Sequence, residues 1–265
     1  MKSRALKFCV PKKTVSAADF YGRLCVSVRH LIIIFGYGNF RLSGICCNEE
    51  KHQVGKVSLM SKLILYIHGK GGNAEEAEHY KALFKNSNVI VLDYTADSPW
   101  TAKDEFPILF DSICGNNQSV TVIANSIGAY YTMLSLNDRQ IEKAFFISPI
   151  VNMEKLITNM MLWANVTEDE LREKGTIKTA FGEILSWSYL CYAREHPAKW
   201  NIPTHILYGE KDDLTSYETI SEFAKEKNAS LTVMKNGEHW FHTDRQMKYL
   251  DDWIKHFRSP LKTTG

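Results

Sequence analysis

Short apolar runs recur along the second part of the chain, each four or five residues long and bounded by polar residues or glycine. Runs of this kind are typical of strands that are buried on both faces of a sheet. The predicted strands are 63–67, 89–92, 120–124, 144–147, 205–208 and 231–234.

Helix-favouring stretches alternate with these runs. They cover 74–84, 104–113, 127–136, 217–227 and 244–257. We expect Pro107 to fall in the first turn of the second of these helices or to kink it, because proline has no amide hydrogen to donate. Alternation of strand and helix at this spacing implies right-handed crossovers. The sequence therefore predicts an α/β fold, with a mostly parallel sheet of about six strands and helices on both faces.

The segment from about 150 to 203 interrupts this alternation. It is helical in propensity and rich in methionine and aromatic residues. A segment of this length within a compact domain is usually a functional cover. We therefore predict a helical lid, in which Trp163 and Trp187 are candidate substrate-binding residues. These side chains could equally serve to pack the insertion onto the sheet, and the two roles are compatible.

Charge divides the chain at Met60. Residues 1–59 carry ten Lys and Arg against three Asp and Glu, whereas residues 60–265 carry 22 against 27. Four of the six cysteines also lie in the first part. We predict that 1–59 is an extension outside the fold, that 60–265 is one domain, and that Met60 is a candidate initiator. The alternative is that 26–35 forms an extra edge strand or hairpin, which its β-branched content permits.

Several classes of partner are not expected. The longest apolar run of the first part, 31–35, is far shorter than the roughly 20 residues of a membrane helix, and no clean signal-peptide cleavage pattern follows it. The cysteines show no paired spacing typical of disulfides or zinc, which favours a reducing cytoplasm. No basic stripe with interleaved aromatic residues marks 60–265, so we expect neither nucleic acid nor membrane as a partner.

Candidate chemistry begins with Ser126, which lies between a predicted strand and a predicted helix. A nucleophile on such a tight turn needs small residues two positions before and two after it, and Ala124 and Gly128 meet this need. The turn also places the serine at a helix N-terminus, where the Ile127 amide favours an oxyanion. Taken alone, the pattern also fits an ordinary helix-capping serine.

A glycine-rich stretch, 68–72, follows the first predicted strand. Glycines let the backbone turn sharply and bring an amide toward a site, and the Lys70 amide is the candidate second oxyanion donor. The stretch lacks the sequence pattern of a nucleotide P-loop and the spacing of a dinucleotide site. His68 is better suited to a structural role than to a catalytic one.

Two late polar residues follow predicted strands. Asp212 comes just after one strand and His239 after the last, so both belong at the carboxyl edge where α/β proteins bind ligands. Spacing favours Asp212 over its neighbour Asp213, and His239 over His242.

The order Ser126, Asp212, His239, with the loop at 237–242, resembles the α/β-hydrolase superfamily over about 61–258. Within it the chain is similar to small bacterial serine hydrolases and carboxylesterases. This resemblance implies an α/β-hydrolase fold, no cofactor and no metal, with a serine nucleophile, a histidine base and an aspartate that orients the base. The chain departs from the usual pattern in two ways: alanine lies two residues before the serine, and the first two strands of larger members have no counterpart.

Together these residues predict acyl transfer to water. The apolar insertion favours a small-molecule substrate that is uncharged or carries an acyl chain, with an ester ahead of an amide. A peptidase or amidase of the same fold is the alternative within this class. A protein that binds a small molecule or a partner without turnover is the alternative outside it, because fold does not dictate function.

Overall fold

The computed structural model describes residues 62–115 and 119–258. The predicted extension at 1–59, the candidate initiator Met60 and the alternative strand at 26–35 lie outside the described residues.

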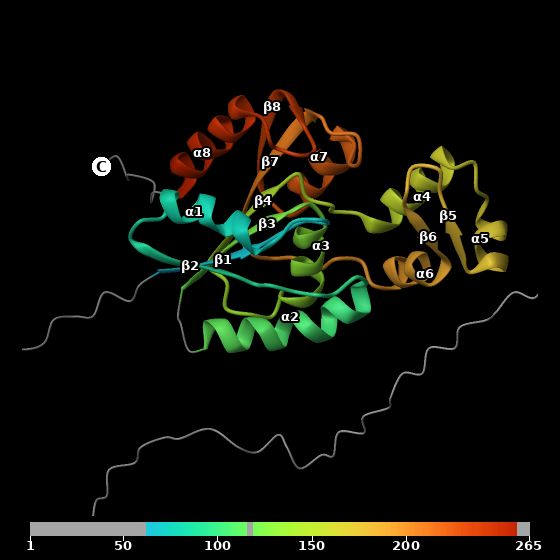
Figure 1. Cartoon of the computed structure of the whole chain (residues 1–265), viewed down its shortest axis with the longest axis horizontal. Helices are drawn as coiled ribbons and strands as arrows, with labels where there is room; N and C mark the ends of the chain where they lie inside the picture. Colours follow the sequence, from blue (N-terminus) through green and yellow to red (C-terminus); the bar gives the residue numbers. More distant parts are fainter. Residues whose placement is uncertain (1–61, 116–118, 259–265) are drawn as a thin grey trace, which may run out of the picture. The chain divides into compact units, whose positions relative to one another are not determined.

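A six-stranded sheet with every pairing parallel forms the centre of the fold, as the sequence predicts (Figure 1). Its strand order is β2-β1-β3-β4-β7-β8. The strands are β1 (Lys62–Ile67), β2 (Ser87–Val91), β3 (Val120–Asn125), β4 (Lys143–Ile147), β7 (Thr204–Lys211) and β8 (Ser230–Glu238). The last two extend past their predicted ends, so that their polar tips reach the carboxyl edge of the sheet.

Helices cover both faces of this sheet. They are η1 (Ala74–Glu76), α1 (Ala77–Leu83), α2 (Pro99–Cys114), α3 (Ser126–Ser135), α7 (Tyr217–Glu226) and α8 (Asp244–Arg258). Successive side chains of β1 enter different clusters, because neighbouring residues of a strand point to opposite faces. Leu65 packs with residues of α2, α3 and α7, whereas Tyr66 packs with residues of α1 and α8.

Helix α2 begins earlier than predicted. Ser98 caps it by accepting a hydrogen bond from the Thr101 amide, and Pro99 occupies its first turn. Proline suits that position because its fixed φ is already helical. Pro107 therefore lies inside the helix, which excludes the first of the two predicted alternatives, a place in the first turn.

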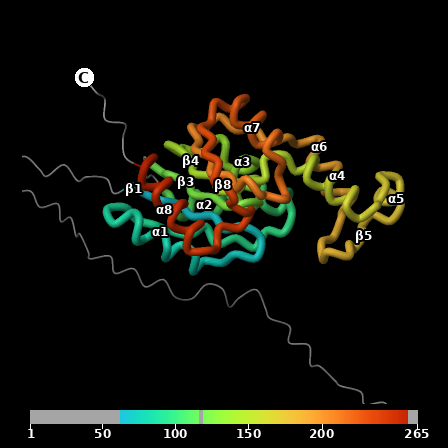
Figure 2. The backbone as a smooth tube through the Cα atoms, turned by 90° about the horizontal axis from the view of Figure 1, so that it is seen from above, coloured from blue at the N-terminus to red at the C-terminus, as the bar shows by residue number. Residues whose placement is uncertain are grey.

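The insertion contains three helices and a strand pair. Its elements are α4 (Met153–Trp163), α5 (Glu168–Lys174), β5 (Thr176–Lys178), β6 (Ile184–Ser186) and α6 (Trp187–Glu195). Strands β5 and β6 form a separate two-stranded antiparallel sheet, which the helical prediction for this segment missed. Both backbone views show these elements gathered at one side of the main sheet (Figure 2).

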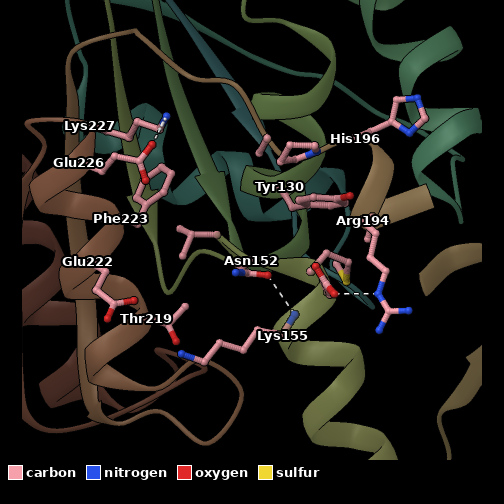
Figure 3. A pocket seen from close by; sticks show the side chains of 16 residues that line it. Tyr130, Asn152, Lys155, Arg194, His196, Thr219, Glu222, Phe223, Glu226 and Lys227 are labelled. Carbon is pink, nitrogen blue, oxygen red and sulfur yellow. Dashed lines mark hydrogen bonds and ion pairs between the residues drawn. The ribbon is translucent and has the colours of Figure 1, made fainter. Parts of the chain in front are cut away.

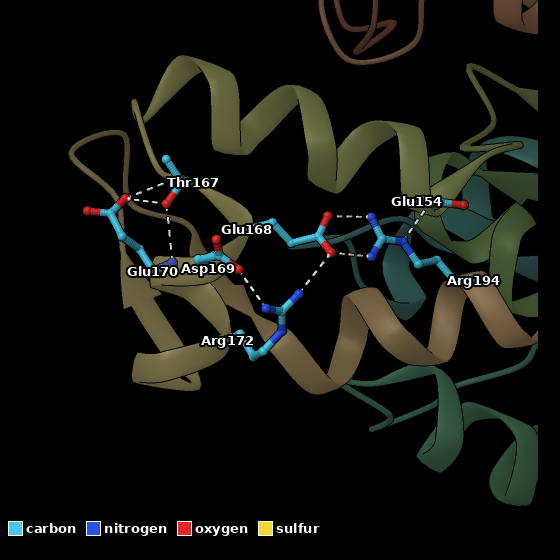
Figure 4. Close-up of polar contacts among 7 residues, drawn as sticks. All are labelled: Glu154, Thr167, Glu168, Asp169, Glu170, Arg172 and Arg194. Atoms are coloured by element: carbon cyan, nitrogen blue, oxygen red, sulfur yellow. Dashed lines mark hydrogen bonds and ion pairs between the residues drawn. The ribbon is translucent and has the colours of Figure 1, made fainter.

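An arginine ties the helices of the insertion together (Figure 4). Arg194 of α6 contacts Glu154 of α4 at 2.7 Å and donates two bonds to Glu168 of α5, both at 2.8 Å. Arg172 extends the network to Asp169 at 2.6 Å. These pairs are exposed to solvent, so they add little to stability, but the two-pronged geometry fixes how the helices meet.

Among residues 62–115 and 119–258, no helix combines the length and the apolar character that crossing a membrane requires.

Candidate active site

Ser126 lies on a sharp turn where β3 ends and α3 begins. Its φ is +49°, in the left-handed region that residues other than glycine rarely adopt. Strain of this kind persists only where the surrounding structure holds it. Gly69 provides part of that surrounding structure, because a Cβ there would lie 3.2 Å from the Ser126 Cβ.

His239 follows directly after β8 and meets the serine. Its Nε2 lies 2.8 Å from Ser126 Oγ, although the two residues are 113 positions apart in sequence. The imidazole side chain is 15% exposed, so one edge remains open to an incoming molecule.

Asp212 lies on the other side of the imidazole, and its side chain is fully buried. One carboxylate oxygen, Oδ2, lies 2.7 Å from His239 Nδ1. The other, Oδ1, accepts hydrogen bonds from the amides of Leu214 (2.9 Å) and Thr215 (3.0 Å). Two main-chain donors therefore fix one oxygen and leave the other directed at the histidine.

The two alternatives considered from the sequence lie elsewhere. Asp213 is exposed. The exposed ring of His242 stacks on Trp240 at 4.5 Å, and its Nδ1 lies 2.8 Å from the carbonyl oxygen of Trp240. The residue in contact with Ser126 is therefore His239, and the carboxylate in contact with His239 is that of Asp212.

Close packing of β7 against β8 brings these two residues together. Gly209 of β7 lies so near to β8 that a Cβ on it would be 2.4 Å from the Glu238 carbonyl oxygen. The strand register shifts between Gly209 and Lys211, which bends the end of β7. The sequence analysis did not predict this close packing of β7 against β8. A glycine near the end of each strand, Gly209 and Gly237, was the feature that indicated it.

The candidate oxyanion residues flank the serine. Ile127 is the second residue of α3, and Lys70 lies in the glycine-rich loop after β1. Both line the same cavity as Ser126. His68, expected to be structural, is 8% exposed and stacks on Tyr94 with ring centres 4.3 Å apart.

The larger cavity at Ser126 lies between the sheet edge and the insertion; we call it the lid cavity. Its volume is about 880 Å³, and α4 contributes only apolar side chains to it. These are Met153, Leu156, Ile157, Met160 and Trp163.

The structure brings Trp163 to the lid cavity but leaves Trp187 outside it. Trp163 meets Phe181 edge to face, with ring centres 6.2 Å apart. Trp187 instead lies beneath the Arg172 guanidinium, whose carbon is 4.8 Å from the centre of the indole ring. The position of Trp187 thus fits the packing role that the sequence also allowed, and its role at a substrate stays a prediction.

A second cavity opens on the other side of the serine, and we call it the histidine cavity. It has a volume of about 610 Å³ and is lined by both Ser126 and His239. Tyr66 and Glu76 also line it, and the Tyr66 hydroxyl donates to the Glu76 carboxylate. Burial, together with nearby Tyr80 and Glu76, raises the pKa of Tyr66, so that its hydroxyl stays protonated.

An ion pair joins the glycine-rich loop at 68–72 to the insertion. The ammonium group of Lys70 pairs with the carboxylate of Glu183, in the turn between β5 and β6. Both residues line the lid cavity. The sequence prediction assigned a role to the Lys70 amide alone and had no signal for this side-chain contact.

A third cavity, of about 260 Å³, lies apart from the serine (Figure 3). Its walls carry charged side chains from the insertion and from α7, including Lys155, Arg194 and Glu222. The Tyr130 side chain lies against it, and burial raises the pKa of that phenol.

Comparison with solved structures identifies the fold. Est1E from Butyrivibrio proteoclasticus superposes with a TM-score of 0.62 at 18% identity, covering 75% of this chain and 87% of that one. Alpha/beta hydrolase domain-containing protein 10 from mouse gives 0.57 at 16%, covering 78% and 91%. A lipase-esterase related protein from Clostridium acetobutylicum gives 0.51 at 16%, covering 74% and 94%.

The chain therefore has the α/β-hydrolase fold, as the resemblance implied. Comparison of the sequence with protein-family models and with curated proteins gave no match.

Proposed function

We propose that the protein is a serine hydrolase that cleaves carboxylic esters through an acyl-enzyme intermediate. The observation that carries this proposal is the continuous contact from Ser126 Oγ through His239 to the buried carboxylate of Asp212. A serine hydroxyl is a weak nucleophile until a base accepts its proton, and a carboxylate on the far ring nitrogen holds that base in the required tautomer.

In the first half of the reaction, Ser126 Oγ attacks the ester carbonyl while its proton passes to His239 Nε2. The main-chain amides of Lys70 and Ile127 stabilise the oxyanion, and one such donor typically contributes about 3 kcal/mol. His239 then protonates the departing alkoxide. In the second half, water gives a proton to His239 and bonds to the acyl carbon, while the bond to Ser126 Oγ breaks and Oγ takes the proton back.

The apolar side chains that α4 contributes to the lid cavity support an ester with an acyl chain as the substrate. Leu156 and Ile157 of α4 carry no group that could hydrogen-bond to a peptide backbone. Burying an unpaired amide beside such side chains costs free energy that an acyl chain avoids. A small-molecule ester is thus favoured over an amide.

Covalent labelling tests the proposal. A fluorophosphonate probe should label the full chain, and Ser126→Ala should abolish the labelling. Ser188→Ala is the matched control because Ser188 is exposed on the insertion, and it should label like the wild type. Labelling accompanied by cleavage of anilides but not of esters would indicate an amidase. Failure of the folded wild type to label would indicate a binding protein without turnover.

A further inference from the structure

The two cavities that meet at Ser126 differ in one respect that bears on ester cleavage. The histidine cavity is lined by both Ser126 and His239, whereas His239 does not line the lid cavity. During acylation the bond between the carbonyl carbon and the alcohol oxygen breaks as the bond to Ser126 Oγ forms. The alcohol oxygen must then take the proton that His239 Nε2 received from the serine.

Proton transfer requires the alcohol oxygen to lie within hydrogen-bond reach of His239 Nε2. Of the two cavities, the histidine cavity is the one that satisfies this condition. The alcohol half of the ester therefore belongs there, and the acyl half extends from Ser126 into the lid cavity.

Polar groups are built into the wall of the histidine cavity. Asn125 Nδ2 donates to the Tyr66 hydroxyl at 2.8 Å, and that hydroxyl donates in turn to Glu76. Gly72 makes room for the carboxylate, because a Cβ on it would lie 2.7 Å from Glu76 Oε1. A second pair on this wall joins His79 Nε2 to Asp251 at 2.7 Å.

The Glu76 carboxylate retains capacity to accept further hydrogen bonds. Its two oxygens offer about four lone-pair sites. Within the described residues, its hydrogen-bond donors are the Tyr66 hydroxyl and, at 3.4 Å, the Asn73 amide. An alcohol carrying a second hydroxyl could donate to this carboxylate, whereas a plain alkyl alcohol would leave it without that partner.

We propose that the histidine cavity is the site for the leaving alcohol, an inference that rests on the proposed ester hydrolysis. Through Glu76, this cavity selects alcohols that carry additional hydroxyl groups. The natural substrate is then an acyl ester of a polyhydroxylated alcohol. Its alcohol half is recognised by the carboxylate, and its acyl half by the apolar side chains of α4.

Acyl transfer to added alcohols measures this site directly. In the reverse of acylation, an alcohol gives its proton to His239 and bonds to the acyl carbon, while the bond to Ser126 Oγ breaks and Oγ takes the proton back. The acceptor must enter where the leaving alcohol left. The full chain would be acylated with p-nitrophenyl butyrate in the presence of equal concentrations of glycerol and 1-propanol, and the two butyrate esters quantified.

We expect the wild type to favour glycerol over 1-propanol, and Glu76→Gln to lower that ratio about tenfold, since a hydrogen bond to a charged acceptor is lost. Glutamine keeps an oxygen that can cap η1. Met160→Ala, in the lid cavity, should change the preferred acyl length but leave the acceptor ratio within twofold. A wild-type ratio near one overturns the proposal without reference to any variant, so its test does not depend on how Glu76→Gln folds.

Two other outcomes also count against it. An unchanged ratio in folded Glu76→Gln would remove Glu76 from alcohol recognition. A ratio that follows Met160→Ala instead would place the acceptor in the lid cavity. Release of p-nitrophenol that is lost in Ser126→Ala establishes the esterase reaction separately. A result against the alcohol site is therefore distinguishable from a result against ester hydrolysis. Loss of ester hydrolysis itself would overturn both proposals.

Discussion

Gly128, in the first turn of α3, lies directly against the main-chain carbonyl of His68 at the end of β1. A Cβ on Gly128 would be only 2.3 Å from that oxygen, a separation that real atoms do not tolerate. The sequence pattern required a small residue two positions after the serine, and this contact is the physical reason. The turn at Ser126 and the glycine-rich loop at 68–72 are thereby packed as one unit.

Gly128→Ala should therefore destabilise the fold by about 1–3 kcal/mol, as overpacking does, and displace the loop that carries Lys70. Urea denaturation and the rate of fluorophosphonate labelling measure the two effects. Gly175→Ala is the control, because a Cβ there meets no atom within 4 Å although its φ is also positive, at +72°. It should cost about 1 kcal/mol through backbone strain and leave labelling unchanged. Equal labelling rates in both variants would contradict the proposed coupling.

The three residues in contact at the site should act as a unit. Ser126→Ala and His239→Ala should each lower kcat/KM by several orders of magnitude, and the double variant should lose little more. His242→Ala is the matched control for the histidine, since its exposed ring does not contact the serine, and it should retain activity within a few-fold. Additive losses in the double variant would show that the two residues do not work in one step.

Replacing the aspartate tests the orienting role. Asp212→Asn keeps the volume but removes the charge, and on the serine-protease pattern it should lower kcat by about 10³–10⁴. Asp213→Asn, on an exposed neighbour, should leave kcat unchanged. The reverse result would assign the orienting carboxylate to Asp213.

The sequence patterns predicted both the parallel sheet and the gathering of Asp212 and His239 near Ser126, and the physical reason is the same for both. The carboxyl ends of parallel strands share one edge, so polar residues placed directly after β3, β7 and β8 must gather there. Ser126, Asp212 and His239 satisfy that condition from their positions alone.

Features that depend on how loops and the insertion pack were not accessible to the same reasoning. Strands β5 and β6 are three residues each, too short to show an alternating pattern. Glu76 reaches the site only because η1 follows the glycine loop closely, and that contact has no signature along the chain. The contact of Trp187 with Arg172 joins two helices of the insertion, and their packing was left open by the sequence.

Stability should depend on pH through His205 of β7. Burial, and then the nearby charges of Lys143 and His256, lowers the pKa of this imidazole, whose Nδ1 lies 2.6 Å from the Ser230 hydroxyl. The unfolded chain then binds a proton more readily than the folded one, so this contribution is complete above the unfolded pKa of about 6.5 and is lost as the pH falls. Melting temperatures at pH 7 and pH 5 should differ less in His205→Gln than in the wild type, while the exposed His242→Gln should match the wild type.

The two tryptophans of the insertion should separate substrate preference from stability. Trp163 is 51% exposed and lines the lid cavity, so Trp163→Ala should change the ratio of kcat/KM between short and long acyl esters by the equivalent of about 1–3 kcal/mol. Trp187 lies outside that cavity beneath Arg172, so Trp187→Ala should lower the melting temperature and leave the ratio unchanged. p-Nitrophenyl esters of graded chain length provide the measurement. If both variants lost activity equally on every ester, Trp163 would serve packing, and the acyl chain would have to lie elsewhere.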